Sequence, residues 1–284
     1  MKMLNFTAAA LGCIMLGASA SSVAWTVDND FDNLSNGSHC GSFWVSPYED
    51  SKVSSEQGSS GTKSCRMDVA QGSTGWGSGF QFPNQLQKGG EFWMRFRLWM
   101  PTDFDYGVYS SGDKLKFIGI DTKDSQGTPA IWYWEWTREN GGEPPYGAIM
   151  SNDNCTDYHD CWQFFGANNQ KPQRGTWETY EVYVKYDNVP ADQGGTGRIR
   201  TWKNGVLVGE LTRRPTLNNA SDTVDAARIF SYWNGGSPKT QHMYLDDFIA
   251  TNVTPSGRDA SGNPYIGTGN YVAIAPPLPP GNIQ

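Results

Sequence analysis

The chain has 284 residues, of which 33 are glycine, 13% are aromatic and only 18% are charged. This composition favours strands and turns over helices, because aromatic residues are enriched in strands and long charged residues are few. A net charge of −7 without any basic tract argues against nucleic acid as a partner, since cations are needed to neutralise its phosphates.

Residues 1–20 have the features of a secretory signal peptide. Lys2 precedes an apolar run that extends to Leu16, and Ala18-Ser19-Ala20 forms an A-x-A cleavage site. The run is too short for a membrane anchor, and no later segment approaches the roughly 20 apolar residues of a spanning helix. We therefore expect an exported protein, extracellular or periplasmic, that does not bind a membrane.

Four cysteines follow the predicted signal peptide: Cys40, Cys65, Cys155 and Cys161. An even number of cysteines in an exported chain predicts disulfides. Three pairings are possible, and the short spacing between Cys155 and Cys161 favours a bridge between these two, which leaves Cys40–Cys65. A metal site that includes His159 is the alternative, although the spacing matches no zinc template.

Short segments typical of strands follow one another along the rest of the chain. A first strand is possible within 28–40, and the Gly/Ser-rich segments 54–63 and 71–79 are predicted loops. Strands are predicted over 65–69, 91–100, 114–121, 130–137, 179–186, 197–202, 206–211, 227–233 and 242–250. Lys203-Asn204-Gly205, between two of them, predicts a type I′ hairpin.

Many short strands without intervening helices predict an all-β fold of two antiparallel sheets, a jelly roll or concanavalin-like sandwich. We expect this domain to span residues 25–253. The Gly/Pro-rich residues 254–284 are predicted to form a C-terminal tail or linker that lies along the surface.

The segment 91–100 alternates strictly, with an apolar set that must face the core. The other set contains Trp93, Arg95, Arg97 and Trp99, which is unusual for a solvent-exposed face. Later strands repeat this mixture of cations and aromatic residues with one parity: Lys114, Lys116, Tyr183, Lys185, Arg198, Arg200, Trp202, His242 and Tyr244.

Rows of this kind on neighbouring strands lie about 4.8 Å apart and can form one continuous surface. Arginine binds carboxylates bidentately and aromatic rings stack on sugar rings, so such a surface indicates a groove for an anionic polysaccharide. The alternative is that the rows are scattered over both outer faces, each paired with nearby carboxylates.

A resemblance to a known family supports the groove. The run FWMRFRLWMPTDFDYGVYSSGDKLKFIGI is similar to the strand–Pro–loop–GGKLPGL segment of jelly-roll polysaccharide lyases that act on alginate and glucuronan. RGTWETYEVYVKYDN, GRIRTWKNGVLVGEL, IFSYWNGGS and MYLDDFIATN follow in the order and spacing of the same family, so the resemblance covers residues 65–253.

The resemblance implies a concanavalin-like jelly roll, lyase activity and a catalytic lysine at Lys114, within the sequence GDKL. Lys116 has the same parity and is the second candidate. The chain departs from the family where the lyases have a serine and an arginine, because it reads Ile131-Trp-Tyr133-Trp-Glu135-Trp136 there. The three tryptophans of this segment share the parity opposite to Tyr133 and are predicted to face the core.

Elimination from a uronate requires three functions at one place. A cation must neutralise the carboxylate while the neighbouring carbon loses its proton, and Arg95 or Arg97 is predicted to do so. A base must take the proton; like charge from the arginines would favour a neutral lysine, so Lys114 or Lys116 is the candidate, with His242 as the alternative. Tyr183 or Tyr244 is predicted to protonate the leaving oxygen. Substrate binding is assigned to Arg95, Arg97, Trp93, Trp99, Tyr133, Lys185 and Arg200.

The sequence thus predicts a secreted, monomeric polysaccharide lyase without an organic cofactor. Two alternatives remain: a carbohydrate-binding jelly roll without catalysis, and a glycoside hydrolase, for which Glu135 and Glu139 are the nearest pair of carboxylates. A structural calcium ion is a further possibility, where the N-terminal strand meets Asp246 and Asp247.

Overall fold

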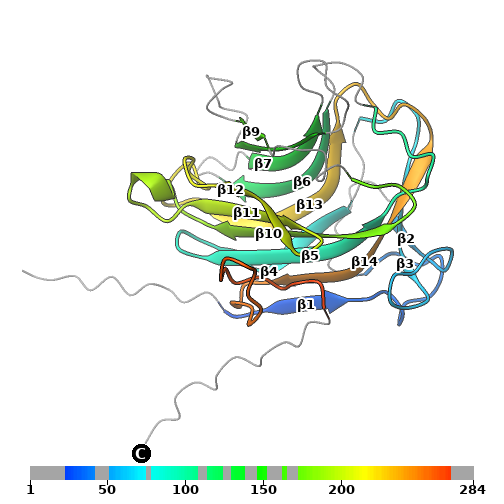
Figure 1. Ribbon diagram of the computed structural model, residues 1–284, viewed down its shortest axis with the longest axis horizontal. Coiled ribbons are helices and arrows are strands. Elements are labelled where there is room, and N and C mark those ends of the chain that lie inside the picture. Colours follow the sequence, from blue (N-terminus) through cyan, green and yellow to red (C-terminus); the bar gives the residue numbers. More distant parts are fainter. Residues whose placement is uncertain are drawn as a thin grey trace, which may run out of the picture.

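The computed structural model describes residues 23–41, 51–74, 78–107, 114–123, 129–137, 146–151, 162–164 and 172–269. These residues form two antiparallel sheets packed face to face, which confirms the predicted all-β jelly-roll sandwich. Figure 1 shows the sheets as two layers, with β5, β10, β11 and β14 in one and β6, β7 and β13 in the other.

The larger sheet, here sheet A, has eight strands. Seven are ordered as β12 (Val206–Leu211), β11 (Arg198–Lys203), β10 (Trp177–Lys185), β5 (Glu91–Trp99), β14 (Gln241–Thr251), β3 (Ser64–Val69) and β2 (Ser51–Ser54), and β1 (Thr26–Asn29) also pairs with β14. Sheet B has the order β4 (Ser78–Leu86), β13 (Thr223–Trp233), β6 (Lys114–Lys123), β7 (Pro129–Thr137), β8 (Tyr146–Ser151) and β9 (Trp162–Phe164).

Side chains of one parity from each sheet fill the space between the layers. On β5 these are Phe92, Met94, Phe96 and Leu98, at most 1% exposed, as the alternation predicts. The ring of Tyr180 on β10 meets Phe117 of the opposite sheet at 4.8 Å between centroids, and further aromatic pairs continue this core. Residues of the other parity therefore face outward from the sandwich.

The sequence missed several strands. β4 contains Pro83 and begins in a Gly/Ser-rich segment, a composition that disfavours a strand. Proline is tolerated here because β4 lies at the edge of sheet B, where its register with β13 is interrupted between Val224 and Ala226. β2, β8 and β9 are short and were also not predicted.

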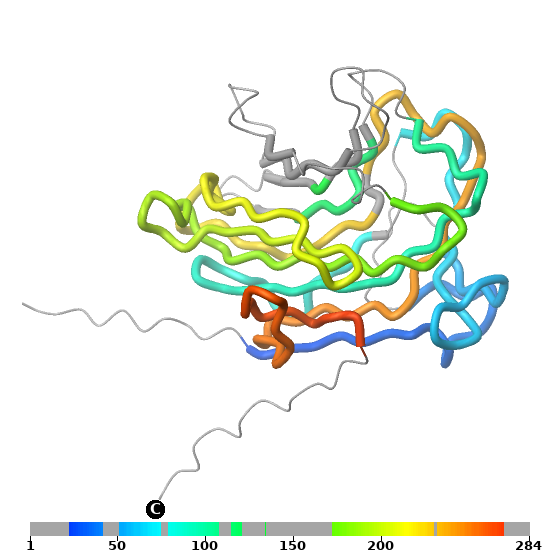
Figure 2. Tube along the Cα trace, in the orientation of Figure 1, coloured from blue at the N-terminus to red at the C-terminus, as the bar shows by residue number. Residues whose placement is uncertain are grey.

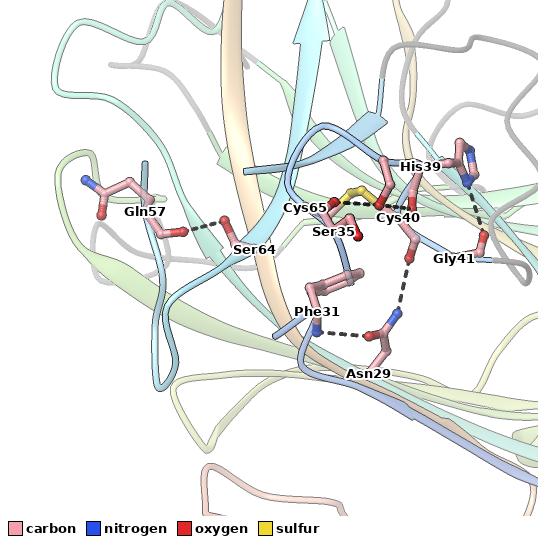
Figure 3. The surroundings of a disulfide bond; sticks show 10 residues. Asn29, Phe31, Ser35, His39, Cys40, Gly41, Gln57, Ser64 and Cys65 are labelled. Carbon is pink, nitrogen blue, oxygen red and sulfur yellow. Dashed lines mark hydrogen bonds between the residues drawn. A yellow bond between two sulfur atoms is a disulfide. The ribbon is translucent and has the colours of Figure 1, made fainter. Parts of the chain in front are cut away.

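Local predictions around the hairpin and the first disulfide are confirmed. Asn204 and Gly205 both have positive φ, of 50° and 78°, as a type I′ turn requires. Cys40 and Cys65 form a disulfide (Figure 3), which attaches the N-terminal segment to β3. Cys155, Cys161 and the predicted signal peptide lie outside the described residues.

The described part of the chain contains only a short 3-10 helix, Ala191–Gln193, besides its strands. No helix within these residues is long and apolar enough to cross a membrane.

Candidate functional site

The predicted cations do not converge in one trough. Arg95, Arg97 and Lys185 lie on the outer face of sheet A, whereas Lys114 and Lys116 lie on β6 of sheet B. The prediction of a single surface is therefore wrong, and the arginines of β5 are not neighbours of the lysines of β6. A strand pattern gives the face within a sheet but not the sheet to which a strand belongs.

A C-terminal segment covers the middle of the outer face of sheet A. Residues 255–269, which we call the strap, lie against β5, β10 and β11, and Figure 2 shows them in orange and red beside β1 in blue. Beneath the strap, Trp93, Tyr183 and Trp202 form a small apolar cluster with Ile249 and Ile266. The indole N–H of Trp93 donates to the carbonyl of Pro264, and that of Trp202 donates to the Asp259 carboxylate at 2.9 Å.

Arg95 and Glu181, paired in register, hold the strap by its backbone. Arg95 donates to the carbonyls of Gly267 and Gly269 at 3.0 and 2.6 Å, and the carboxylate of Glu181 accepts the N–H groups of Ile266 and Gly267. Burial raises the pKa of Glu181 to about 7, although these N–H groups and Arg95 oppose the shift. Burial likewise lowers the pKa of Arg95. The geometry thus assigns Arg95 and Trp93 to binding the strap instead of a substrate.

Arg97 contacts a different segment, the loop after β2. Its guanidinium donates to the Ser59 hydroxyl at 3.0 Å and to Asp247, whose carboxylate also accepts from Ser59 and Ser60. Asp247 has a φ of 48° where β14 bulges away from β5, which places its side chain against this loop. Burial raises the pKa of the neighbouring Asp246 to about 6.

At the position predicted for calcium, the carboxylate oxygens already accept hydrogen bonds from the chain itself. β1 does lie beside β14, but both oxygens of Asp246 accept backbone N–H groups, from Ser59 and Asp247. Within the described residues, no group of three or more His, Cys, Asp or Glu side chains is arranged to hold a metal ion. These residues do not fit a calcium ion as they stand, and calcium binding stays a prediction.

The other two cations of sheet A that were assigned to substrate binding, Lys185 and Arg200, are paired with carboxylates near the start of β5. Lys185 and Tyr183 both donate to Glu91, and Arg200 donates to Glu210 at 2.8 Å. Burial, and then the charge of Glu91, raise the pKa of Tyr183. A tyrosine bound in this way is a poor proton donor to a sugar. The cations of this surface are scattered and paired with nearby carboxylates, as the alternative prediction had it.

His242 and Tyr244 lie in a third cluster, on β14. The Tyr244 hydroxyl donates to Glu56, which also binds Arg66, and the rings of His242 and Tyr244 meet edge to face at 5.1 Å. Burial and the charge of Arg66 lower the pKa of His242, so its ring is neutral at neutral pH. Tyr183 and Tyr244 flank β5 at opposite ends, opposite Trp93 and Trp99 respectively.

The outer face of sheet B brings Lys116 together with two residues that the sequence did not single out. Lys116 Nζ lies 5.4 Å from the ring centre of Tyr232, its register partner on β13. Tyr232 is 41% exposed, a high value for a large aromatic side chain. Arg228 lies on the same strand, paired with Gly119 three residues beyond Lys116 on β6, and is half-buried.

The backbone register extends this face across β7. Lys116 is paired with Glu135, and Gly119 with Tyr133, so the segment that departs from the lyase pattern lies next to Lys116. Trp134, predicted to face the core, is 2% exposed and packs between the sheets. The side chains of Lys114, Tyr133, Trp132 and Trp136 are outside the described part of the structure.

The sequence analysis did not single out Arg228 and Tyr232, although both lie in the predicted strand 227–233. Residues four apart on a regular strand share a face, so an arginine and a tyrosine at this spacing in ARIFSYW were the available signal. The register of β13 with β6 shifts between Ile229 and Tyr232, and no sequence signal identifies such a bulge.

No protein-family model matches the sequence, and no curated protein matches it. Solved structures share its fold. Alginate lyase Aly36B superposes with a TM-score of 0.57 and 14% identity over 80% of this chain and 96% of that one. Alginate lyase vAL-1 from Chlorella virus gives 0.51 and 15% over 72% and 89%, and the cellulose induced protein Cip1 gives 0.52 and 13% over 86% and 100%. The chain therefore has the jelly-roll fold of polysaccharide lyases, as the resemblance implied.

Proposed function

We propose that the protein is a secreted polysaccharide lyase that cleaves a uronate-containing polysaccharide, such as alginate or glucuronan, at the outer face of sheet B. The observation that carries the proposal is the pairing of Lys116 with the exposed Tyr232, with Arg228 on the same face. These are the three types of side chain that the elimination requires.

Each residue has a defined role in the reaction. Lys116 takes the proton from the carbon that bears the carboxylate. Tyr232 donates its phenolic proton to the glycosidic oxygen as the bond from carbon to that oxygen breaks, and a double bond forms between the two carbons. Arg228 binds the carboxylate, because a guanidinium neutralises the charge that develops there. Lys114, the lysine that the family resemblance indicates, is the alternative base on the same strand.

The fold and the substrates of its neighbours support the choice of polymer. Variants of Aly36B were solved in complex with alginate tetrasaccharide and trisaccharide, so this sandwich accommodates a uronate polymer in that protein. The Cys40–Cys65 disulfide is consistent with export to an oxidising compartment, as the predicted signal peptide requires.

A lyase assay tests the proposal. The protein is incubated with alginate, glucuronan and ulvan, and the ultraviolet absorbance of the unsaturated product is followed. We expect the absorbance to rise, and Lys116→Ala and Tyr232→Phe each to reduce kcat by about 10²-fold or more, the range typical for loss of a general acid or base. Arg228→Ala is expected to lower kcat/KM.

Lys239→Ala is the matched control, because Lys239 forms an exposed ion pair with Asp103. It should leave the rate unchanged. Reducing ends without absorbance would show a hydrolase, and retardation of the protein in a polysaccharide gel without any product would show a binding module. Activity that persists in Lys116→Ala but is lost in Lys114→Ala would transfer the role of base to Lys114.

A further inference from the structure

One row of residues crosses five strands on the part of sheet A that makes no described contact with the strap. Successive register pairs connect Trp177 to Trp99, Trp99 to Tyr244, Tyr244 to Arg66 and Arg66 to Lys52. We call these five residues the transverse row. All of them have the outward parity of their strands, and the row lies at the end of β5 away from Trp93 and the strap.

Two indoles form one half of the transverse row. Trp177 and Trp99 are directly opposite each other on neighbouring strands, and both are partly exposed. The ring of Trp99 also meets the ring of Tyr244 edge to face, at 5.7 Å and 64°, which fixes its orientation. Neighbouring strands are about 4.8 Å apart, so the two indoles follow one another at a spacing close to the length of a sugar ring.

Hydrogen-bonding groups form the other half of the transverse row. Arg66 binds Glu56 and Asp68, at 2.5 and 2.9 Å, and Glu56 accepts the hydroxyl of Tyr244. Together with Lys52, which is exposed, this makes two cations and two carboxylates, so the charges cancel. A surface with indole faces followed by a dense, neutral set of donors and acceptors matches a ligand that carries many hydroxyls and no charge.

We propose that the transverse row is a second glycan-binding site, which takes a linear, uncharged polysaccharide whose rings carry equatorial hydroxyl groups. Equatorial substitution leaves the C–H groups on the two faces of each ring, and these flat apolar faces stack on Trp177 and Trp99. The hydroxyls at the ring edges bind the carboxylates of Glu56 and Asp68 and the guanidinium of Arg66. Because Lys116 lies on the outer face of the other sheet, both faces can bind a polymer at once.

Affinity electrophoresis tests this site with the full chain. Native gels contain hydroxyethyl cellulose as the uncharged probe or alginate as the anionic probe. We expect hydroxyethyl cellulose to retard the protein, and Trp177→Ala or Trp99→Ala to weaken binding about tenfold, as is typical for the loss of an aromatic anchor. An uncharged glucan contains no uronate to eliminate, so this result is independent of any lyase activity.

Variants at the two ends of β5 separate binding from folding. Trp99→Tyr retains a ring and should restore part of the affinity, whereas Lys88→Ala, at the far turn before β5, should change nothing. Thermal melts of each variant confirm the fold, and Trp177, at the start of β10, is the variant least expected to disturb it.

Three results would overturn the proposal. The first is no retardation of the wild-type protein by hydroxyethyl cellulose. The second is retardation that the folded tryptophan variants retain. The third is retardation by alginate alone that is lost in Trp99→Ala, which would show that the site takes an anionic polymer.

Discussion

The two arginines of β5 point outward because they bind parts of the chain itself. Arg95 binds strap carbonyls and Arg97 binds Ser59 and Asp247, so both guanidinium groups have partners within the chain. Glu181 lies beside Arg95 under the strap and carries the opposite charge, and its carboxylate accepts two strap N–H groups. Burial of a charged carboxylate costs free energy, and this cost raises the pKa of Glu181.

Glu181 makes the stability of the protein depend on pH. Its pKa is about 7 in the folded protein, against an ordinary value of 4.5. Between these values the unfolded chain releases a proton that the folded protein retains, so the free energy of unfolding falls as pH rises from about 4.5 to about 7. The loss is on the order of 3 kcal/mol. Urea unfolding at pH 5, 6 and 7 should show this decline in the wild type, and Glu181→Gln should remove the part of it that Glu181 contributes.

Other charged groups surround Glu181. Arg95 and Asp259 face it from β5 and from the strap, and Asp246 on β14, whose pKa is also raised by burial, contributes a decline of the same sign. The quantity to compare is therefore how far the free energy of unfolding falls from pH 5 to pH 7 in the wild type and in the variant. Glu210→Gln, a half-exposed glutamate paired with Arg198 and Arg200, is the control. Parallel curves for wild type and Glu181→Gln would contradict the prediction.

Among the elements, the strap has the largest effect on which outward side chains of sheet A are accessible. The residues beneath the strap alternate as on any strand of a sandwich, but their outward side chains are as buried as core residues. Trp93 and Trp202 are each 1% exposed. The outer face of sheet A thus has a second, smaller core under residues 255–269.

Removal of the strap should expose both indoles. A chain ending at residue 254 loses the partners of Trp93, Trp202 and the Arg95–Glu181 pair, and we expect it to unfold at a lower temperature, with tryptophan fluorescence shifted to longer wavelength. Quenching by acrylamide measures the exposure directly. A chain ending at residue 269 keeps every described strap contact and should match the full chain. Equal quenching in the two truncated forms would show that the strap does not cover these residues.

For the whole molecule, the sequence was sufficient for the sandwich but not for the site. Alternation on β5 and β10, and the Asn204-Gly205 turn, depend on local geometry, and the structure confirms them. Whether β6 and β5 share a sheet depends on chain crossovers between distant strands, which no local pattern encodes. Arg95 was assigned to a ligand because the strap, 172 residues away in the chain, has no sequence feature that predicts its partner.

The disulfide attaches the N-terminal segment to sheet A and provides a test at this scale. Cys40–Cys65 closes a loop with a sequence separation of 25 and attaches the segment after β1 to β3, and these two strands pair one after the other with the side of β14 opposite β5. In the loop-entropy account, opening such a loop costs about 3.5 kcal/mol of stability. The double variant Cys40→Ser/Cys65→Ser should therefore melt roughly 7–14 °C lower, with a smaller free energy of unfolding. Neither cysteine approaches Lys116 on sheet B, so product formation at a temperature well below the melting transition should equal that of the wild type. A fall in kcat without a fall in melting temperature would mean that the N-terminal segment acts on the site itself.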